Sequence, residues 1–153
     1  MLSQKTRYAL KALMLLADSE RQKKGPVLIS ELAKKGNMPQ KFLEAILLEL
    51  KIQGILRSKK GKGGGYSLGR PPEDIKFGGV IRALEGPLAL LPCVSQTAYK
   101  KCDECLDEET CGIRALFKEV RDATAAILDS ASLAKVQSVE ARIGENRKQM
   151  YFI

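Results

Sequence analysis

Four cysteines carry the clearest chemistry in this 153-residue chain, and all of them fall between positions 93 and 111. They are Cys93, Cys102, Cys105 and Cys111, separated by eight, two and five residues. Thiolates bind soft metals and iron–sulfur clusters, and a Cys-x-x-Cys step lets two sulfurs from one turn reach one metal. The spacing therefore predicts a metal site, and on ligand count alone iron and a structural zinc fit equally well.

The rest of the composition narrows the class of protein. The chain has no His, which removes the usual general base and excludes a Ser-His-Asp or Cys-His enzyme. A Cys-x-x-Cys oxidoreductase is disfavoured because no βαβ pattern surrounds the cysteines. No apolar run approaches the roughly 20 residues that cross a bilayer, and the N-terminus lacks a secretory apolar core. We therefore expect a cytoplasmic protein that is not an enzyme, with reduced thiols and no membrane partner.

Positive charge is concentrated in the first half of the chain. Residues 1–76 hold 16 Lys and Arg against 7 Asp and Glu, whereas residues 77–153 hold 10 against 11. Such an excess is expected of a half that binds a polyanion, because Lys and Arg neutralise phosphates and release counterions. A merely soluble basic surface is the alternative.

Patterns in the first half predict a helix-turn-helix. Helical spacing of apolar residues predicts helices over about 3–18, 29–35 and 39–53. Gly36-Asn37 ends the second helix, and Pro39 suits the first position of the third. Gln40 and Lys41 then lie exposed near the start of the third helix, where base edges are usually read. Arg7, on the first helix, is a further candidate DNA contact.

A wing is predicted directly after these helices. Residues 55–58 and 66–68 have strand character, and a basic, glycine-rich tip lies between them. The glycines allow the backbone to approach phosphates closely, and the lysines supply charge. The sequence fits neither a phosphate-binding loop nor a dinucleotide fingerprint. The candidate DNA-binding residues of this wing are Lys59, Lys60, Lys62, Gly64 and Tyr66.

The remaining elements complete the predicted organisation. A short helix spans 77–85, and a polar, acidic loop that is expected to be solvated contains the cysteines. The next helix has a long apolar stripe from Ile113 to Leu128, which can be core or a dimer seam; we favour a dimer arm because the preceding module is already complete. The predicted units are a DNA-binding domain (1–87), a cysteine-rich ligand loop (88–111), a dimerisation helix (112–135) and a weakly helical or disordered tail (136–153).

The chain resembles the IscR- and NsrR-type regulators, a family of Rrf-type winged-helix dimers that commonly sense iron–sulfur or redox status. The resemblance covers roughly residues 1–135. The motifs that carry it are KTRYAL (5–10), FLE (42–44), GILRS (54–58), GGGYSL (63–68) and C-x5-CGIR (105–114). It implies a mainly α fold with a small β-hairpin: a winged helix-turn-helix and a long C-terminal dimerisation helix.

The resemblance also implies roles for individual residues. Lys59 is similar to the basic wing residue that enters the minor groove, and Cys93, Cys105 and Cys111 are similar to the three cluster cysteines. The spacing before Cys105 departs from the family pattern. The family's fourth ligand is also absent, because Arg114 and Tyr8 stand at the positions that supply it elsewhere. Cys102 is therefore the candidate fourth ligand.

The expected function is that of a homodimeric transcription factor on a double-stranded, pseudo-palindromic operator. Its expected cofactor is a [2Fe–2S] or [4Fe–4S] cluster, and zinc or mononuclear iron remain open. The alternatives are a zinc-stapled or metal-free DNA-binding regulator and, further away, a thiol redox protein.

Overall fold

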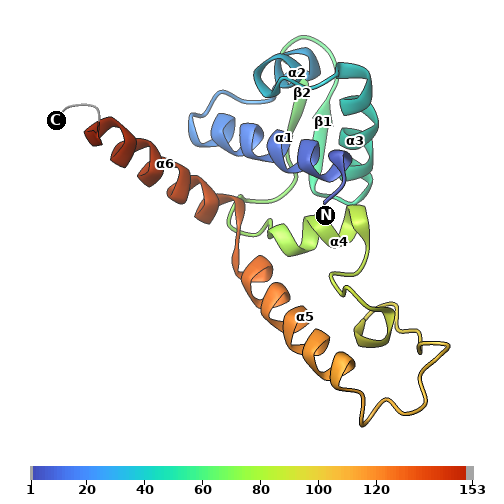
Figure 1. The fold of residues 1–153 in the computed structure, drawn as a ribbon. Coiled ribbons are helices and arrows are strands. Elements are labelled where there is room, and N and C mark those ends of the chain that lie inside the picture. The colour runs from blue at the N-terminus through green and yellow to red at the C-terminus, as the bar shows by residue number, and fades with distance from the viewer. Residues whose placement is uncertain (1, 151–153) are drawn as a thin grey trace.

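The computed structural model describes residues 2–150 and is mainly helical (Figure 1). This confirms the predicted fold class, a mainly α chain with one β-hairpin. The elements in chain order are α1 (Gln4–Arg21), α2 (Ile29–Gly36), α3 (Gln40–Ile52), β1 (Leu56–Lys59), β2 (Gly65–Leu68), α4 (Phe77–Glu85), the 3-10 helix η1 (Pro92–Val94), α5 (Gly112–Ser130) and α6 (Leu133–Met150).

Helices α1, α2, α3 and α4 and the hairpin share one apolar core. Local signals fix the ends of these helices as the sequence predicts: the Ser3 hydroxyl caps α1 by accepting a hydrogen bond from the Thr6 N–H at 3.1 Å. Asn37 ends α2 in the left-handed conformation, with φ 48°. The largest fully buried side chains are Leu13, Leu32, Leu43, Ile46, Leu47, Leu50, Ile75, Leu133, Val80 and Thr6.

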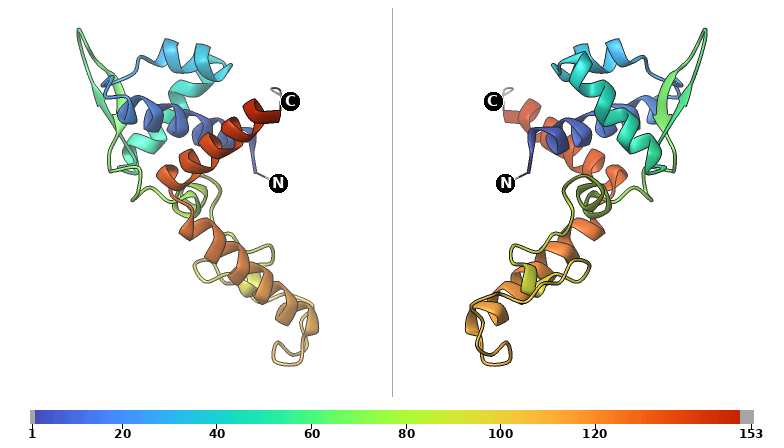
Figure 2. Two further views of the ribbon diagram at one scale, coloured as in Figure 1. Left: turned by 90° about the vertical axis from the view of Figure 1, so that its left-hand side faces the viewer. Right: turned by 90° about the vertical axis from the view of Figure 1, so that its right-hand side faces the viewer.

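The hairpin pairs β1 with β2 in antiparallel register, with Leu56 opposite Leu68 and Lys59 opposite Gly65. Val27 extends it, because its backbone exchanges two 2.8 Å hydrogen bonds with Tyr66. The ribbon projects to one side of the helices, as a wing does (Figure 2). This arrangement confirms the predicted winged helix-turn-helix.

Helix α5 extends away from the module that α1 to α4 and the hairpin form, and the cysteine loop lies near its far end (Figure 1). No residue of α5 is buried, although it carries a stripe of apolar side chains. The exposed members of that stripe are Ile113, Leu116, Val120 and Ile127. The stripe is therefore not part of this chain's own core.

The tail over 136–153, for which the sequence left a weak helix and disorder open, is helical in the part that the structure describes, because residues 133–150 form helix α6. Two contacts start this helix: the Ser132 hydroxyl accepts a hydrogen bond from the Lys135 N–H at 3.1 Å, and Leu133 is fully buried in the core. Helix α6 then packs against α1. Residues 151–153 of the predicted tail lie outside the described range. No described helix is long and apolar enough to cross a membrane.

Candidate DNA-binding surface and cysteine loop

Helix α3 begins at Gln40, so Gln40 and Lys41 occupy its first turn, and both side chains are exposed. Its buried face holds the helix against the core through Leu43, Ile46, Leu47 and Leu50. Helix α1 braces it from the side. Lys5 forms an ion pair with Glu49 at 3.1 Å, and the Tyr8 and Phe42 rings meet edge to face at 5.8 Å. Helix α3 therefore presents its first turn to solvent on a rigid support.

Three lysines carry the charge of the wing. Lys59, Lys60 and Lys62 are exposed, and none of them forms an ion pair with any residue in the described range. Arg7 is likewise exposed on α1. Such side chains can pair with an external anion such as a phosphate without first breaking an ion pair.

Two of the predicted wing contacts have clear structural roles. Gly64 is buried beneath the tip, where a Cβ would collide with the carbonyl oxygen of Lys59. Tyr66 is half-buried and packs against the core, while its backbone pairs with Val27. Gly65 has φ 139° and lies against the Val27 carbonyl, which leaves no room for a side chain. The glycines therefore shape the wing, whose tip lysines remain exposed.

The cysteine loop is not uniformly solvated, and that prediction is wrong for its first cysteine. Cys93 lies in η1 and is only 5% exposed, with Val94 beside it equally buried. Helix η1 packs against α5, and Arg121 of α5 donates a hydrogen bond to the Val94 carbonyl. Cys93 is therefore buried against α5, outside the main core cluster.

The other three cysteines are more accessible. Cys102 and Cys105 sit on one turn, in which the Cys105 N–H donates to the Cys102 carbonyl at 3.2 Å. The neighbouring Cys93 thiol raises the pKa of Cys102, and desolvation and the nearby Cys105 add to the rise. Cys111 caps α5, where its Sγ accepts the Arg114 N–H at 3.4 Å. The structure thus brings Cys93 and Cys102 together, with Cys105 nearby, and sets Cys111 at the helix start.

The four thiols are suitable ligands for an iron–sulfur cluster, but they are not gathered around one point. Four thiols on one loop are the ligands that iron–sulfur clusters use. Within residues 2–150, however, no group of three or more His, Cys, Asp or Glu side chains is gathered as a metal site. Binding a metal would therefore require the segment between Cys102 and Cys111 to move.

Tyr8 and Arg114 stand where the regulators that this chain resembles carry the fourth ligand, and neither offers a metal ligand to this loop. Tyr8 accepts a hydrogen bond from Gln4 within α1 at 2.8 Å. Arg114 lies with its Nε 3.9 Å from Glu108 Oε1, and the Tyr99 hydroxyl donates to the same oxygen at 2.7 Å. This hydrogen bond raises the pKa of Tyr99. These three side chains brace the loop against α5.

Sequence reasoning missed the side chains that join α5 to the rest of the chain. Arg121 reaches back to Val94, 27 residues earlier, and Arg82 of α4 pairs with Asp129, 47 residues later. In the sequence, a single charged residue on a helix cannot be distinguished from one that is exposed to solvent. The sequence therefore gives no signal for either of these two contacts.

Comparison with known proteins places the chain. The model of the Rrf2 family, described as "Iron-dependent Transcriptional regulator", matches residues 2–138. The chain is 44% identical over 134 residues to a putative HTH-type transcriptional regulator, rrf2-like, of Rhodobacter capsulatus, covering 87% of this chain and 89% of that protein. It is 32% identical over 152 residues to the HTH-type transcriptional regulator CymR of Bacillus subtilis, covering 99% of each.

Solved structures agree. The structure of CymR, the global cysteine regulator of B. subtilis, matches with a TM-score of 0.75 and 29% identity over 91% of this chain and 97% of that one. The IscR of T. potens matches with a TM-score of 0.71 and 27% identity over 92% and 88%. With the winged fold, the family match and relatives that are regulators rather than enzymes, the chain belongs to the Rrf2 family of transcriptional regulators.

Proposed function

We propose that this regulator binds a pseudo-palindromic operator as a homodimer, and that its cysteine loop holds an iron–sulfur cluster whose presence sets operator affinity. The observation that carries the proposal is the place of the four thiols. Cys93 lies between α4 and α5, and Cys111 is the first turn's cap on α5. A change at this loop therefore acts directly on the helix that joins two subunits.

The proposed DNA contacts divide by chemistry. Gln40 and Lys41, on the first turn of α3, are suited to base edges in the major groove, and Arg7 to the flanking backbone. Lys59, Lys60 and Lys62 are suited to phosphates beside the minor groove, where the exposed wing would lie. Gly64 and Tyr66 support these contacts by shaping the wing.

The proposed dimer forms through α5. The exposed stripe from Ile113 to Ile127 has helical spacing along one face, with Ile113 65% and Ile127 68% exposed, and burial of such a stripe favours association. Leu116→Glu should give a monomer in sedimentation equilibrium, because it buries a charge at the seam. Ala115→Glu adds the same negative charge at an exposed site off the stripe and should remain a dimer. A dimeric Leu116→Glu protein would place the seam elsewhere.

The proposed cluster ligands are Cys93, Cys102, Cys105 and Cys111. When bound, a [2Fe–2S] or [4Fe–4S] cluster supplies a site that gains or loses electrons or is lost altogether. The chain's own part is to hold η1 against α5 through Arg121, and to tie the loop to α5 through Arg114 and Cys111. A cytoplasmic setting, in which thiols stay reduced, suits this chemistry.

Ligand variants test the cluster. Cys111→Ala should lose the visible charge-transfer absorbance of the anaerobically purified protein, together with its iron. Leu106→Ala, in the same loop and fully exposed, should keep both. Cys102→Ala asks about the fourth ligand, and a full cluster in that variant would exclude Cys102. Iron retained in all four single cysteine variants would refute the loop as the site.

A second candidate is a regulator that senses through its thiols without a metal. The nearness of the Cys93 and Cys102 thiols favours it, because neighbouring thiols can be oxidised together without a metal. The relative CymR is described as a global cysteine regulator. This candidate predicts a wild-type protein without iron or sulfide, whose operator affinity changes when Cys93 or Cys102 is replaced. A structural zinc would instead give a constant zinc content and no response to oxidants.

A further inference from the structure

The base of α5 is joined to the DNA-binding module at one small joint. There the chain between α5 and α6 pairs with the start of α4: the Phe77 N–H donates to the Ala131 carbonyl at 2.9 Å, and the Leu133 N–H to the Ile75 carbonyl at 3.0 Å. Leu133 itself is fully buried in the module's core. These contacts therefore fix where α5 begins to leave the module. They do not fix its direction, which depends on side-chain contacts.

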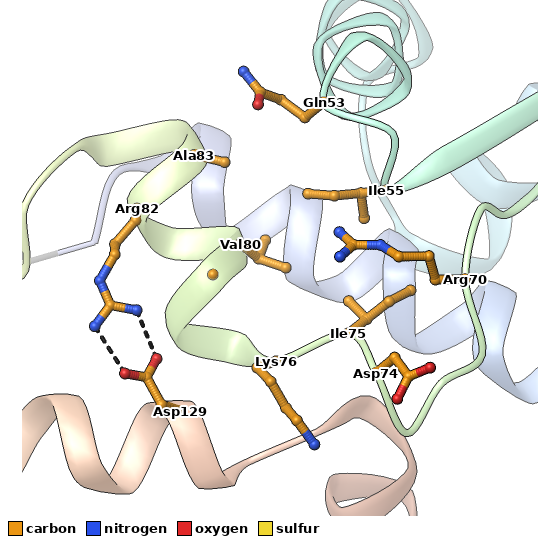
Figure 3. A pocket seen from close by; sticks show the side chains of 11 residues that line it. Gln53, Ile55, Arg70, Asp74, Ile75, Lys76, Val80, Arg82, Ala83 and Asp129 are labelled. Atoms are coloured by element: carbon orange, nitrogen blue, oxygen red, sulfur yellow. Dashed lines mark hydrogen bonds and ion pairs between the residues drawn. The ribbon is translucent and has the colours of Figure 1, made fainter.

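One ion pair closes the joint from the side (Figure 3). Arg82 of α4 forms a bidentate ion pair with Asp129 of α5, in which Nη1 donates to Oδ1 at 2.6 Å and Nη2 donates to Oδ2 at 2.9 Å. This pairing lowers the pKa of Asp129 and raises that of Arg82. Gly78 packs beneath the carboxylate, where a Cβ would collide with Oδ1. A bidentate pair fixes an angle as well as a distance.

Little else determines the direction of α5. It has no buried residue, and its main contacts within the chain are with α4 and η1. A pocket opens beside the ion pair, between α4 and the segment that includes Gln53 and Ile55 (Figure 3). Packing from that side therefore does not hold α5, and the pair of Arg82 and Asp129 is the main side-chain link at this end.

We infer that Arg82 and Asp129 are positioning residues that fix the angle between α5 and the recognition helix α3, and so the operator half-site spacing that the dimer accepts. The inference rests on the proposed dimer through α5. A helix of 19 residues is about 28 Å long. A rotation of about 10° at the joint would displace its far end by roughly 5 Å, which exceeds the ~3.4 Å rise of one base pair. A loosened joint therefore relaxes spacing without removing any DNA contact.

The test measures spacing selectivity rather than affinity. Wild-type protein first selects its operator from random-sequence DNA, and the spacer of that operator is then lengthened and shortened by one and two base pairs. Selectivity is the affinity for the selected spacer divided by that for each altered one. Arg82→Ala and Asp129→Ala should each lower this ratio about fivefold, the low end for coupling between sites. The double variant should be no worse than either.

Arg82→Ala and Asp129→Ala change the net charge in opposite directions. Comparing them therefore distinguishes an effect of the angle of α5 from an effect of net charge on DNA affinity. Arg82→Ala should weaken binding to all spacers and Asp129→Ala should strengthen it, yet both lose selectivity. Arg82→Lys keeps the charge without the fork and should lose part of the selectivity. Arg21→Ala, whose partner Asp18 lies on the same helix, and Glu119→Ala, exposed on α5, are the matched controls and should keep the full ratio.

Sedimentation and circular dichroism accompany each measurement. An unchanged ratio in folded, dimeric Arg82→Ala and Asp129→Ala proteins would overturn this inference alone. A monomeric wild-type protein, or one that selects an operator without spaced half-sites, would overturn the proposed dimer and this inference with it.

Discussion

Lys59 ends strand β1 next to the tip of the wing, and Lys59→Ala removes one exposed positive charge there. The side chain contacts no carboxylate among the described residues, and the pairing of Lys59 with Gly65 uses the backbone, which alanine keeps. We therefore expect the variant to fold as the wild type does and to lose one phosphate contact.

The size of the loss follows from counterion release. Each phosphate that a lysine neutralises adds about 0.9 to the slope of log affinity against log salt. The slope for Lys59→Ala should be smaller by that amount. Between about 50 and 200 mM salt, the wild-type protein should then lose roughly 3.5-fold more affinity than the variant does.

Fluorescence anisotropy with a labelled operator, titrated over this salt range, measures both slopes. Lys118→Ala is the matched control, because it removes the same charge from an exposed site on α5 and should leave the slope unchanged. Equal slopes for Lys59→Ala and wild type would refute the assignment of the wing to the phosphates. Equal losses in Lys59→Ala and Lys118→Ala would show a general charge effect instead.

Three further predictions concern stability. Leu133→Ala should lower the free energy of unfolding by about 2–5 kcal/mol in urea titration, because it empties a fully buried site at the joint, and an unchanged midpoint would contradict its core position. The Ser3 and Thr6 side chains, together with the Ser3 N–H that Glu85 accepts at 2.7 Å, lower the pKa of Glu85 from 4.5 to about 2. Its carboxylate therefore adds stability above pH 4.5 that is lost as pH falls toward 2, and Glu85→Gln should flatten the stability curve over that range. Gly65→Ala should lower the free energy of unfolding by roughly 1–3 kcal/mol in thermal melts and weaken operator binding. Gly79, which is helical and has open space around it, is the control: Gly79→Ala should leave the free energy of unfolding unchanged or raise it by ~0.5–1 kcal/mol in the same melts.

Much of the DNA-binding module could be predicted because its signals are local. The cap at Ser3, the left-handed end at Asn37 and the bounds of α4 depend on residues a few positions apart. The wing follows from strand-forming residues around a glycine-rich tip. These features agree with the resemblance to a winged-helix family, which the family match confirms.

The structure of the cysteine loop and of the helices after it was harder to predict, because contacts between residues far apart in the sequence determine it. Cys93 precedes a polar, acidic loop, yet it is buried because η1 packs against α5. Helix α6 has little amphipathic pattern, and its first turn depends on Ser132 and on the burial of Leu133. The pairing of Arg82 with Asp129 spans 47 positions and leaves no periodic trace in the sequence.

The content of iron and acid-labile sulfide in the anaerobically isolated protein, measured together with its operator affinity, tests the central proposal most directly. We predict iron and sulfide in equal amounts, lost together in Cys111→Ala, and an operator affinity that changes when the cluster is removed from the wild-type protein. Stoichiometric zinc with neither iron nor sulfide would contradict the proposal. So would an operator affinity that stays the same with and without the cluster.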